Sequence, residues 1–284
     1  MKIIAVCFTV ITAIFCFNAH SIYADRDSSA PIQTIKVPAV SGSVTMINVD
    51  LYIPAGVKIR GDLLVLPGWK YSRTRWHQET NLIHFADRFG FRCVFPEMNT
   101  SCYESAYFPE TRMKWSTMPG GAWVREILIP FMQKNHEIFA EKNFNCVLGL
   151  STGARGAALV SLQNPKIFKA AAALSGDYNQ FTMPQDKLMA AIYGDFESFR
   201  KRWQSVDNPY MSALVGEWKI PIYIGHGDKD AVTPESQSRH FSKMLKTKYM
   251  KLDIIFNSAY GFGHDFKYWD SELDAIFNFF NRVK

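Results

Sequence analysis

One stretch decides the fold of this chain: Cys146-Val147-Leu148-Gly149-Leu150-Ser151-Thr152-Gly153-Ala154-Arg155-Gly156-Ala157-Ala158. The apolar run at its start predicts a buried strand, and the small residues after the serine predict a helix. Between them stands the pattern G-x-S-x-G, which is typical of a sharp strand-to-helix turn that holds a serine above the edge of a parallel sheet. Glycines fit such a turn because the strand and helix backbones approach closely. We therefore predict that Ser151 is a nucleophile. The alternative is a surface serine in a glycine-rich turn.

The composition is that of a globular protein. The chain has 284 residues, of which 48% are hydrophobic and 20% charged, enough for one large core in a single α/β domain. The net charge is +6, and the basic residues are spread along the chain instead of gathered in one tract. This distribution favours a solvated surface over nucleic-acid binding, so no nucleic-acid partner is expected.

The N-terminus has the organisation of a secretory signal peptide. Lys2 precedes an apolar run, Ile3 to Phe17, and Ser21-Ile22-Tyr23-Ala24 then offers a cleavage site after Ala24. A membrane anchor is the alternative, but the run is shorter than the roughly 20 residues that a spanning helix needs. We expect an exported protein, periplasmic or secreted, with no stable membrane anchor. Residues 1–24 are the predicted signal peptide and residues 25–284 a single domain.

Three cysteines remain after that cleavage: Cys93, Cys102 and Cys146. An exported chain can form disulfides, and Cys93 and Cys102 are close enough in sequence to pair. Cys93 also lies in a predicted strand, so this pairing stays open. Cys146 is expected to be a buried thiol. The cysteine count does not indicate a metal cluster, and no metal or cofactor is expected.

Strands and helices alternate along the chain. Strands are expected at 32–37, 43–53, 62–66, 91–95, 146–150, 168–174, 220–225 and 251–256, and helices at 75–89, 122–139 with a bend at Pro130, 154–162, 234–245 and 268–282. The first two strands should form an antiparallel pair. Residues 177–219 lack a strand pattern and are expected to form a helical cap. The alternation predicts an α/β fold with a mostly parallel central sheet, helices on both faces, and a site beyond the carboxyl ends of the strands.

A serine nucleophile needs a histidine base and a carboxylate that orients it. Only His226 and His264 follow predicted strands. His264, in the loop after the last strand, is the preferred base, and His226 is expected to shape the turn at the end of its own strand. The turn after residues 220–225 supplies the acid: Asp230 is preferred, and Asp228 is expected to hold the turn. The remaining histidines fall in or near predicted helices or in the signal peptide: His77, His84, His136, His240 and His20.

An oxyanion hole needs two N–H donors. The amide of Thr152, directly after the nucleophile, supplies one. The second is expected from the turn after residues 62–66, at Trp69 or at Lys70. The alternative for this turn is a plain reversal with a core tryptophan.

On these motifs the chain resembles the esterase D-like enzymes in the Putative esterase branch of the α/β-hydrolases, from Asp62 to Phe280. The resemblance implies carboxylic-ester hydrolysis through an acyl-enzyme, without cofactor or metal, with nucleophile, acid and base on Ser151, Asp230 and His264. One departure is that the family usually has Met-Gly-Gly after the serine, whereas this chain has Thr152-Gly153-Ala154. The motifs that carry the resemblance are Gly149 to Ala157, Ala171-Ala172-Ala173-Leu174-Ser175-Gly176, Tyr193-Gly194-Asp195 and Gly263-His264-Asp265-Phe266-Lys267-Tyr268-Trp269.

The leading hypothesis is an exported serine carboxylesterase that acts on a small-molecule ester. Acyl transfer or peptide cleavage on the same triad is a second hypothesis, with residues 96–119 and 177–219 deciding the choice. A catalytically silent binding protein with this fold is a third. Arg155 is an unexpected neighbour of the nucleophile. Five basic residues in loops near the site either favour an anionic or polyhydroxylated acyl ester or form a solvated surface: Lys70, Arg73, Arg75, Arg112 and Lys114.

Overall fold

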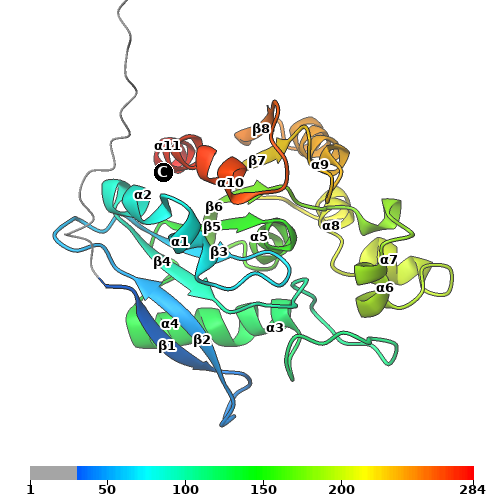
Figure 1. Ribbon diagram of the computed structural model, residues 1–284, viewed down its shortest axis with the longest axis horizontal. Coiled ribbons are helices and arrows are strands. Elements are labelled where there is room, and N and C mark those ends of the chain that lie inside the picture. Colours follow the sequence, from blue (N-terminus) through cyan, green and yellow to red (C-terminus); the bar gives the residue numbers. More distant parts are fainter. Residues whose placement is uncertain (1–30) are drawn as a thin grey trace, which may run out of the picture.

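The computed structural model describes residues 31–284, so the predicted signal peptide lies outside the described residues. The described chain forms one eight-stranded sheet in the order β1-β2-β4-β3-β5-β6-β7-β8 (Figure 1). Its strands are β1 (Gln33–Pro38), β2 (Met46–Tyr52), β3 (Gly61–Leu66), β4 (Phe91–Pro96), β5 (Asn145–Leu150), β6 (Phe168–Leu174), β7 (Ile222–Gly227) and β8 (Ile254–Ala259).

Most of the sheet is parallel. β1 pairs antiparallel with β2, and β2 pairs antiparallel with β4, whereas every pairing from β4 through β8 is parallel. β3 and β5 are buried along their whole length, as expected for parallel strands covered on both faces. The predicted α/β fold with a mostly parallel sheet is therefore confirmed.

Helices cover both faces of this sheet. One face carries α1 (Arg75–Glu79), α2 (Leu82–Phe89), α10 (Phe266–Ser271) and α11 (Leu273–Val283), which share one apolar cluster with the strands. The other face carries α3 (Gly120–Trp123), the π-helical turn η1 (Val124–Leu128), α4 (Ile129–His136), α5 (Thr152–Gln163) and α9 (Glu235–Lys248) in a second cluster. The sheet is thus held between two apolar layers.

The segment 177–219 contains four helical elements and no strand: the 3₁₀ turn η2 (Gln180–Thr182), α6 (Lys187–Tyr193), α7 (Arg200–Ser205) and α8 (Pro209–Val215). In Figure 1, α6 and α7 stand at one side of the molecule, beyond the sheet. They have an apolar cluster of their own, centred on Trp203, which also includes Cys102 from the loop 96–119. The amide of Arg112 in that loop donates to the Ala191 carbonyl over 2.8 Å, so the loop and this helical segment pack as one unit.

The helix predicted at 75–89 is interrupted at Thr80. The Thr80 hydroxyl donates to the Trp76 carbonyl and accepts the Leu82 amide, which replaces helical bonds locally. Asp270 of α10 accepts the Asn81 amide over 2.6 Å. This tertiary contact spans 189 residues and could not be anticipated from a local pattern.

The helix predicted at 122–139 is irregular before Pro130, because a proline removes one backbone donor and crowds the preceding turn. The structure absorbs this in the π-helical turn Val124–Leu128, and α4 then begins with Pro130 at its start. α4 ends at His136, three residues earlier than predicted, because Glu137 takes a left-handed conformation with φ 54°.

The two strands predicted at 220–225 and 251–256 lie two to three residues later in the structure. β7 runs two residues further than predicted and includes His226 and Gly227. The last strand begins at Ile254, because α9 extends to Lys248 and a turn follows it. The last helix is divided at Glu272, whose buried carboxylate accepts the Tyr223 hydroxyl over 2.5 Å.

Cys93, Cys102 and Cys146 are all free and buried, so the open pairing of Cys93 with Cys102 is not formed. The two side chains belong to different apolar clusters. Burial raises the pKa of all three thiols, which makes them poor nucleophiles. Within residues 31–284, no helix combines the length and the apolar character needed to cross a bilayer.

Candidate active site

Ser151 stands between β5 and α5 in a strained conformation, with φ 54° and ψ −125°. Such angles are costly for a residue with a side chain, and they are common where function needs them. The turn is tight: a Cβ at Gly149 would collide with the Gly153 carbonyl, and a Cβ at Gly153 would collide with the Leu66 carbonyl. The G-x-S-x-G pattern therefore has a steric basis in this structure. The Ser151 side chain is neither fully buried nor fully exposed.

His264 and Asp230 form a close pair. His264 Nδ1 lies 2.7 Å from Asp230 Oδ2, while Asp230 Oδ1 accepts the amides of Val232 and Thr233 over 2.8 and 2.9 Å. An ionised carboxylate can only accept, so Nδ1 carries the proton and Nε2 is left with a free lone pair. This is the tautomer that a general base requires.

The Asp230 side chain has no exposed surface, yet it is held in its ionised form. Burial alone raises the pKa of a carboxylic acid. In Asp230, hydrogen bonds from His226, His264 and the Thr233 amide outweigh burial, so its pKa lies well below the ordinary value. The carboxylate therefore keeps its charge at neutral pH.

A series of contacts connects Ser151 to His264. A Cβ on Gly68, in the turn after β3, would lie 3.1 Å from the Ser151 Cβ and 3.2 Å from the Tyr71 ring. The Tyr71 ring is 6.1 Å from that of Trp269, which in turn lies 5.1 Å edge-on to the imidazole of His264. Serine and histidine thus share one edge of the sheet.

The Ser151 hydroxyl makes no hydrogen bond to His264 among the described residues. Catalytic hydrogen bonds in unliganded enzymes are often long and tighten when substrate binds. Trp269, which packs against His264, donates to the Ser175 hydroxyl over 3.1 Å at the end of β6. This bond holds Trp269, which packs against His264, next to the end of β6, the strand that pairs with β5.

Thr152 and Trp69 are the two candidates for the predicted oxyanion-hole donors. Thr152 is the first residue of α5, and the first amides of a helix have no partner within the helix. In the turn after β3, the Lys70 amide already donates to the Asn99 carbonyl over 2.7 Å. Lys70 is thereby engaged, which favours Trp69 of the two alternatives. Gly68, the residue before Trp69, lies against Ser151.

The two aspartates after β7 have different roles. Asp228 accepts the Gly261 amide over 2.6 Å and lies 3.6 Å from the Lys229 ammonium, so it holds the turns after β7 and β8. Asp230 contacts both His264 and His226. This geometry supports the preference for Asp230. The contact of His226 with Asp230 was missed in the sequence, although the spacing His226-Gly227-Asp228-Lys229-Asp230 carried the signal.

Arg155 does not face solvent: its side chain is completely buried. One terminal nitrogen lies 3.1 Å from Asp177 Oδ2 and 2.9 Å from Gln180 Oε1, and the other contacts the Tyr193 hydroxyl and the Asp207 carbonyl. These four partners belong to the segment 177–219. Burial alone lowers the pKa of a guanidinium, but Tyr193 and Asp177 outweigh it and the pKa of Arg155 is raised. Arg155 therefore ties α5, just after the nucleophile, to the helical segment.

Two of the five basic residues near the site are paired within the protein. Arg73 lies 2.9 Å from Asp50 and 3.2 Å from Glu97. Arg75 pairs with Glu79 and stacks over the Tyr71 ring at 4.2 Å. Lys70, Arg112 and Lys114 are exposed. The two paired arginines give no support to an anionic substrate.

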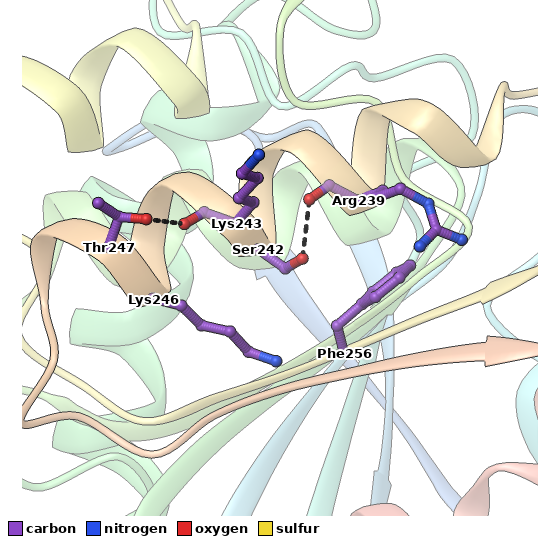
Figure 2. A pocket seen from close by; sticks show the side chains of 6 residues that line it. All are labelled: Arg239, Ser242, Lys243, Lys246, Thr247 and Phe256. Carbon is purple, nitrogen blue, oxygen red and sulfur yellow. Dashed lines mark hydrogen bonds between the residues drawn. The ribbon is translucent and has the colours of Figure 1, made fainter.

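A hollow of about 450 Å³ lies between α9 and β8 (Figure 2), lined by Arg239, Ser242, Lys243, Lys246, Thr247 and Phe256. It contains none of the three candidate catalytic residues. Figure 2 shows the Arg239 side chain over the Phe256 ring, at 5.2 Å from its centroid. Within residues 31–284, no group of three or more His, Cys, Asp or Glu side chains is placed to hold a metal ion.

A mostly parallel eight-stranded sheet, a serine on a strained strand-to-helix turn and a His–Asp pair after the last two strands define an α/β-hydrolase. Residues 95–280 match the model of the family described as "Putative esterase". The chain belongs to this family, which confirms the resemblance to esterase D-like enzymes. No curated protein matches the chain.

Solved structures with the same fold are only distantly similar in sequence. An S-formylglutathione hydrolase from Agrobacterium tumefaciens superposes with a TM-score of 0.71 at 13% identity, covering 89% of this chain and 94% of that one. The fluorophosphonate-binding serine hydrolase F of Staphylococcus aureus gives 0.67 at 15% identity, covering 90% and 100%. A ferulic acid esterase gives 0.66 at 16%, covering 89% and 98%. At these identities the likeness establishes the fold alone.

Proposed function

We propose that this protein is an exported serine carboxylesterase with Ser151, His264 and Asp230 as its triad. The observation that carries the proposal is the 2.7 Å pair of His264 and Asp230 on the sheet edge where Ser151 occupies its strained turn. Membership of the esterase family supports the reaction class. The apolar N-terminal stretch supports export.

The geometry of the site supports the following reaction. His264 Nε2 takes the proton of the Ser151 hydroxyl as its oxygen attacks the ester carbonyl, and Asp230 stabilises the imidazolium that forms. The amides of Thr152 and Trp69 hold the oxyanion of the tetrahedral intermediate. His264 returns the proton to the departing alcohol, which leaves an acyl group on Ser151. Water, activated by the same histidine, then releases the acid.

The proposed substrate is a small-molecule ester. Two similar structures are S-formylglutathione hydrolases and a third is a ferulic acid esterase, which supports acyl-oxygen or acyl-sulfur cleavage as the reaction. The loop 96–119 and the segment 177–219 are packed together and would form the walls that select the acyl and alcohol groups.

A fluorophosphonate probe tests the proposal, because it forms a covalent bond only with an activated serine. The purified protein is expected to be labelled once per chain, and the Ser151→Ala and His264→Ala variants are expected to lose labelling. Ser161→Ala, a change of a serine on the same helix that bonds only the Ala157 carbonyl, serves as control and should label like the unmodified protein. Labelling that persists in Ser151→Ala would overturn the triad.

A substrate panel separates ester hydrolysis from the alternatives. Aryl esters should be hydrolysed to free acid, whereas added alcohols or amines should not divert the acyl group and peptides should remain intact. Transfer of the acyl group to an added alcohol at the expense of free acid would instead indicate an acyltransferase. A folded protein that reacts with neither probe nor ester would indicate a binding protein.

A further inference from the structure

His226 is a second histidine on the carboxylate of Asp230. Its side chain has no exposed surface, and its Nε2 lies 3.2 Å from Asp230 Oδ2, the oxygen that His264 also contacts. The same Nε2 lies 3.0 Å from the Thr233 carbonyl. Its Nδ1 lies 2.7 Å from the Ser238 hydroxyl on α9. Each ring nitrogen of this buried imidazole therefore has a defined partner.

These partners determine where the proton of His226 resides. A carbonyl and an ionised carboxylate only accept hydrogen bonds, so Nε2 must carry the N–H and share it between Thr233 and Asp230. In the neutral imidazole Nδ1 is then an acceptor, and Ser238, whose hydroxyl can donate, satisfies it. The result is a directed series: Ser238 donates to His226, His226 donates to Asp230, and His264 donates to Asp230 from the other side.

We infer that His226 is a positioning residue for catalysis: through its Nε2–H it holds the Asp230 carboxylate in place, so that Asp230 orients His264 toward Ser151. The inference rests on the proposed function, because it assigns a role within the same triad. It differs from the role expected from the sequence, in which His226 only shapes a turn. Two backbone amides hold Oδ1 of Asp230. His226 therefore fixes the position of Oδ2, the oxygen that accepts the hydrogen bond of His264.

The surroundings of His226 contain few other charges. Glu235 at the start of α9 interacts with it, but that carboxylate is bound by Arg239 and by the Ser258 hydroxyl. From the segment 177–219, Tyr178 approaches Ser238, and from α10 Tyr268 approaches Asp230. Burial raises the pKa of both phenols, so neither is charged near neutral pH. Among the ionisable groups around His226, Asp230 is the one that its Nε2 contacts directly, and His264 contacts the same oxygen of Asp230.

Loss of the Nε2–H has a defined expected effect on the rate. In His226→Phe the carboxylate loses one charge-assisted hydrogen bond and is free to rotate, so kcat should fall about 10- to 100-fold while KM changes less than about 3-fold. Asp230 Oδ2 would then bind only His264 and would hold its imidazolium more tightly. The acidic limb of the kcat/KM profile should therefore move to higher pH, by about 0.5 to 1 unit.

Two further variants test the direction of the series. His226→Gln keeps an N–H donor near the position of Nε2 and should recover most of the rate and the original pH profile. Ser238→Ala removes the donor to Nδ1 and should show a smaller fall in kcat. Exposed residues on the same helix supply matched controls, His240→Phe and Ser236→Ala, which should behave like the unmodified protein.

The tautomer can be observed in the unmodified enzyme, independently of any variant. In ¹⁵N-histidine NMR spectra at neutral pH, His226 should appear as the Nε2–H tautomer, identified by the signals lost in His226→Gln. An Nδ1–H tautomer would overturn the inference, as would a folded His226→Phe variant with unchanged kcat and pH profile. If His226→Phe does not fold, the Ser238→Ala rate and the NMR tautomer still decide.

Failure of the proposed function would look different. If the unmodified protein were not labelled by the fluorophosphonate probe, the triad itself would be wrong. If labelling and hydrolysis depend on Ser151 while His226→Phe is unaffected, only the positioning role is overturned.

Discussion

Arg155 provides a test of how the nucleophile helix is joined to the segment 177–219. Replacement by Met removes a guanidinium with no exposed surface and leaves Asp177, Gln180, Tyr193 and the Asp207 carbonyl without their common donor. Removing one partner of a buried ion pair costs about 3–5 kcal/mol of the free energy of unfolding. For a domain of this size, each kcal/mol lowers Tm by about 2 °C, so Tm should fall by about 6–10 °C.

The assay is thermal unfolding followed by circular dichroism, together with limited proteolysis. New cleavage should appear within residues 177–219, because these residues are anchored to α5 through Arg155. Arg88→Met is the matched control: its carboxylate partner lies 3.4 Å away and both side chains are more than half exposed. Such a surface pair contributes about 0–1 kcal/mol, so Tm should change by about 2 °C or less.

A second substitution separates the buried charge from the lost packing. Adding Asp177→Asn to Arg155→Met removes the carboxylate that the first change leaves uncompensated, and part of the lost Tm should return. The reasoning would be refuted if Arg155→Met lowered Tm no more than Arg88→Met does and left the proteolysis pattern unchanged.

Three other predictions concern the triad and its surroundings. Asp230→Asn should lower kcat about 10⁴-fold in ester hydrolysis. Since folding lowers the pKa of Asp230, the stability that this carboxylate contributes should be present above about pH 4 and lost as the pH falls through its pKa in the folded protein. The same pH dependence of unfolding in the unmodified protein and in Asp230→Asn would contradict this. Gly149→Ala should slow fluorophosphonate labelling of Ser151 by about 10²-fold or more, because the new Cβ meets the backbone; equal labelling rates would contradict the steric account. Arg73→Gln should change the ratio of kcat/KM between anionic and neutral acyl esters less than about 2-fold, since the charge of Arg73 is paired with the carboxylates of Asp50 and Glu97. A tenfold fall in kcat/KM for the anionic ester alone would instead indicate that the enzyme prefers anionic substrates.

The strands of the sheet could be predicted from the sequence because the pattern that indicates each strand lies within a few consecutive residues. Strands such as residues 146–150 are continuous apolar runs, and the serine turn after them has a steric requirement that only glycine meets. The positions of Asp230 and His264 followed from the same logic, since parallel strands end at one edge of the sheet.

What the sequence could not supply depends on contacts between distant residues. Thr80 interrupts a helix partly because Asp270, nearly two hundred positions later, accepts the next amide. The sequence did not show that Arg155 anchors the segment 177–219, because its partners there follow no strand pattern from which their positions could be predicted. His226 was assigned to a turn: its spacing from Asp230 indicates that the two residues are near each other, but not that its ring lies against the same carboxylate oxygen as His264.

As the nucleophile, Ser151 should carry the acyl group during turnover. The most direct measurement is mass spectrometry of the enzyme quenched in acid during hydrolysis of an aryl ester, followed by peptide mapping. One acyl group per chain is expected on the peptide that contains Ser151, and no acylated peptide is expected from the Ser151→Ala variant. Hydrolysis that continues with the acyl group on another residue, or with no acyl-enzyme and undiminished in Ser151→Ala, would contradict it.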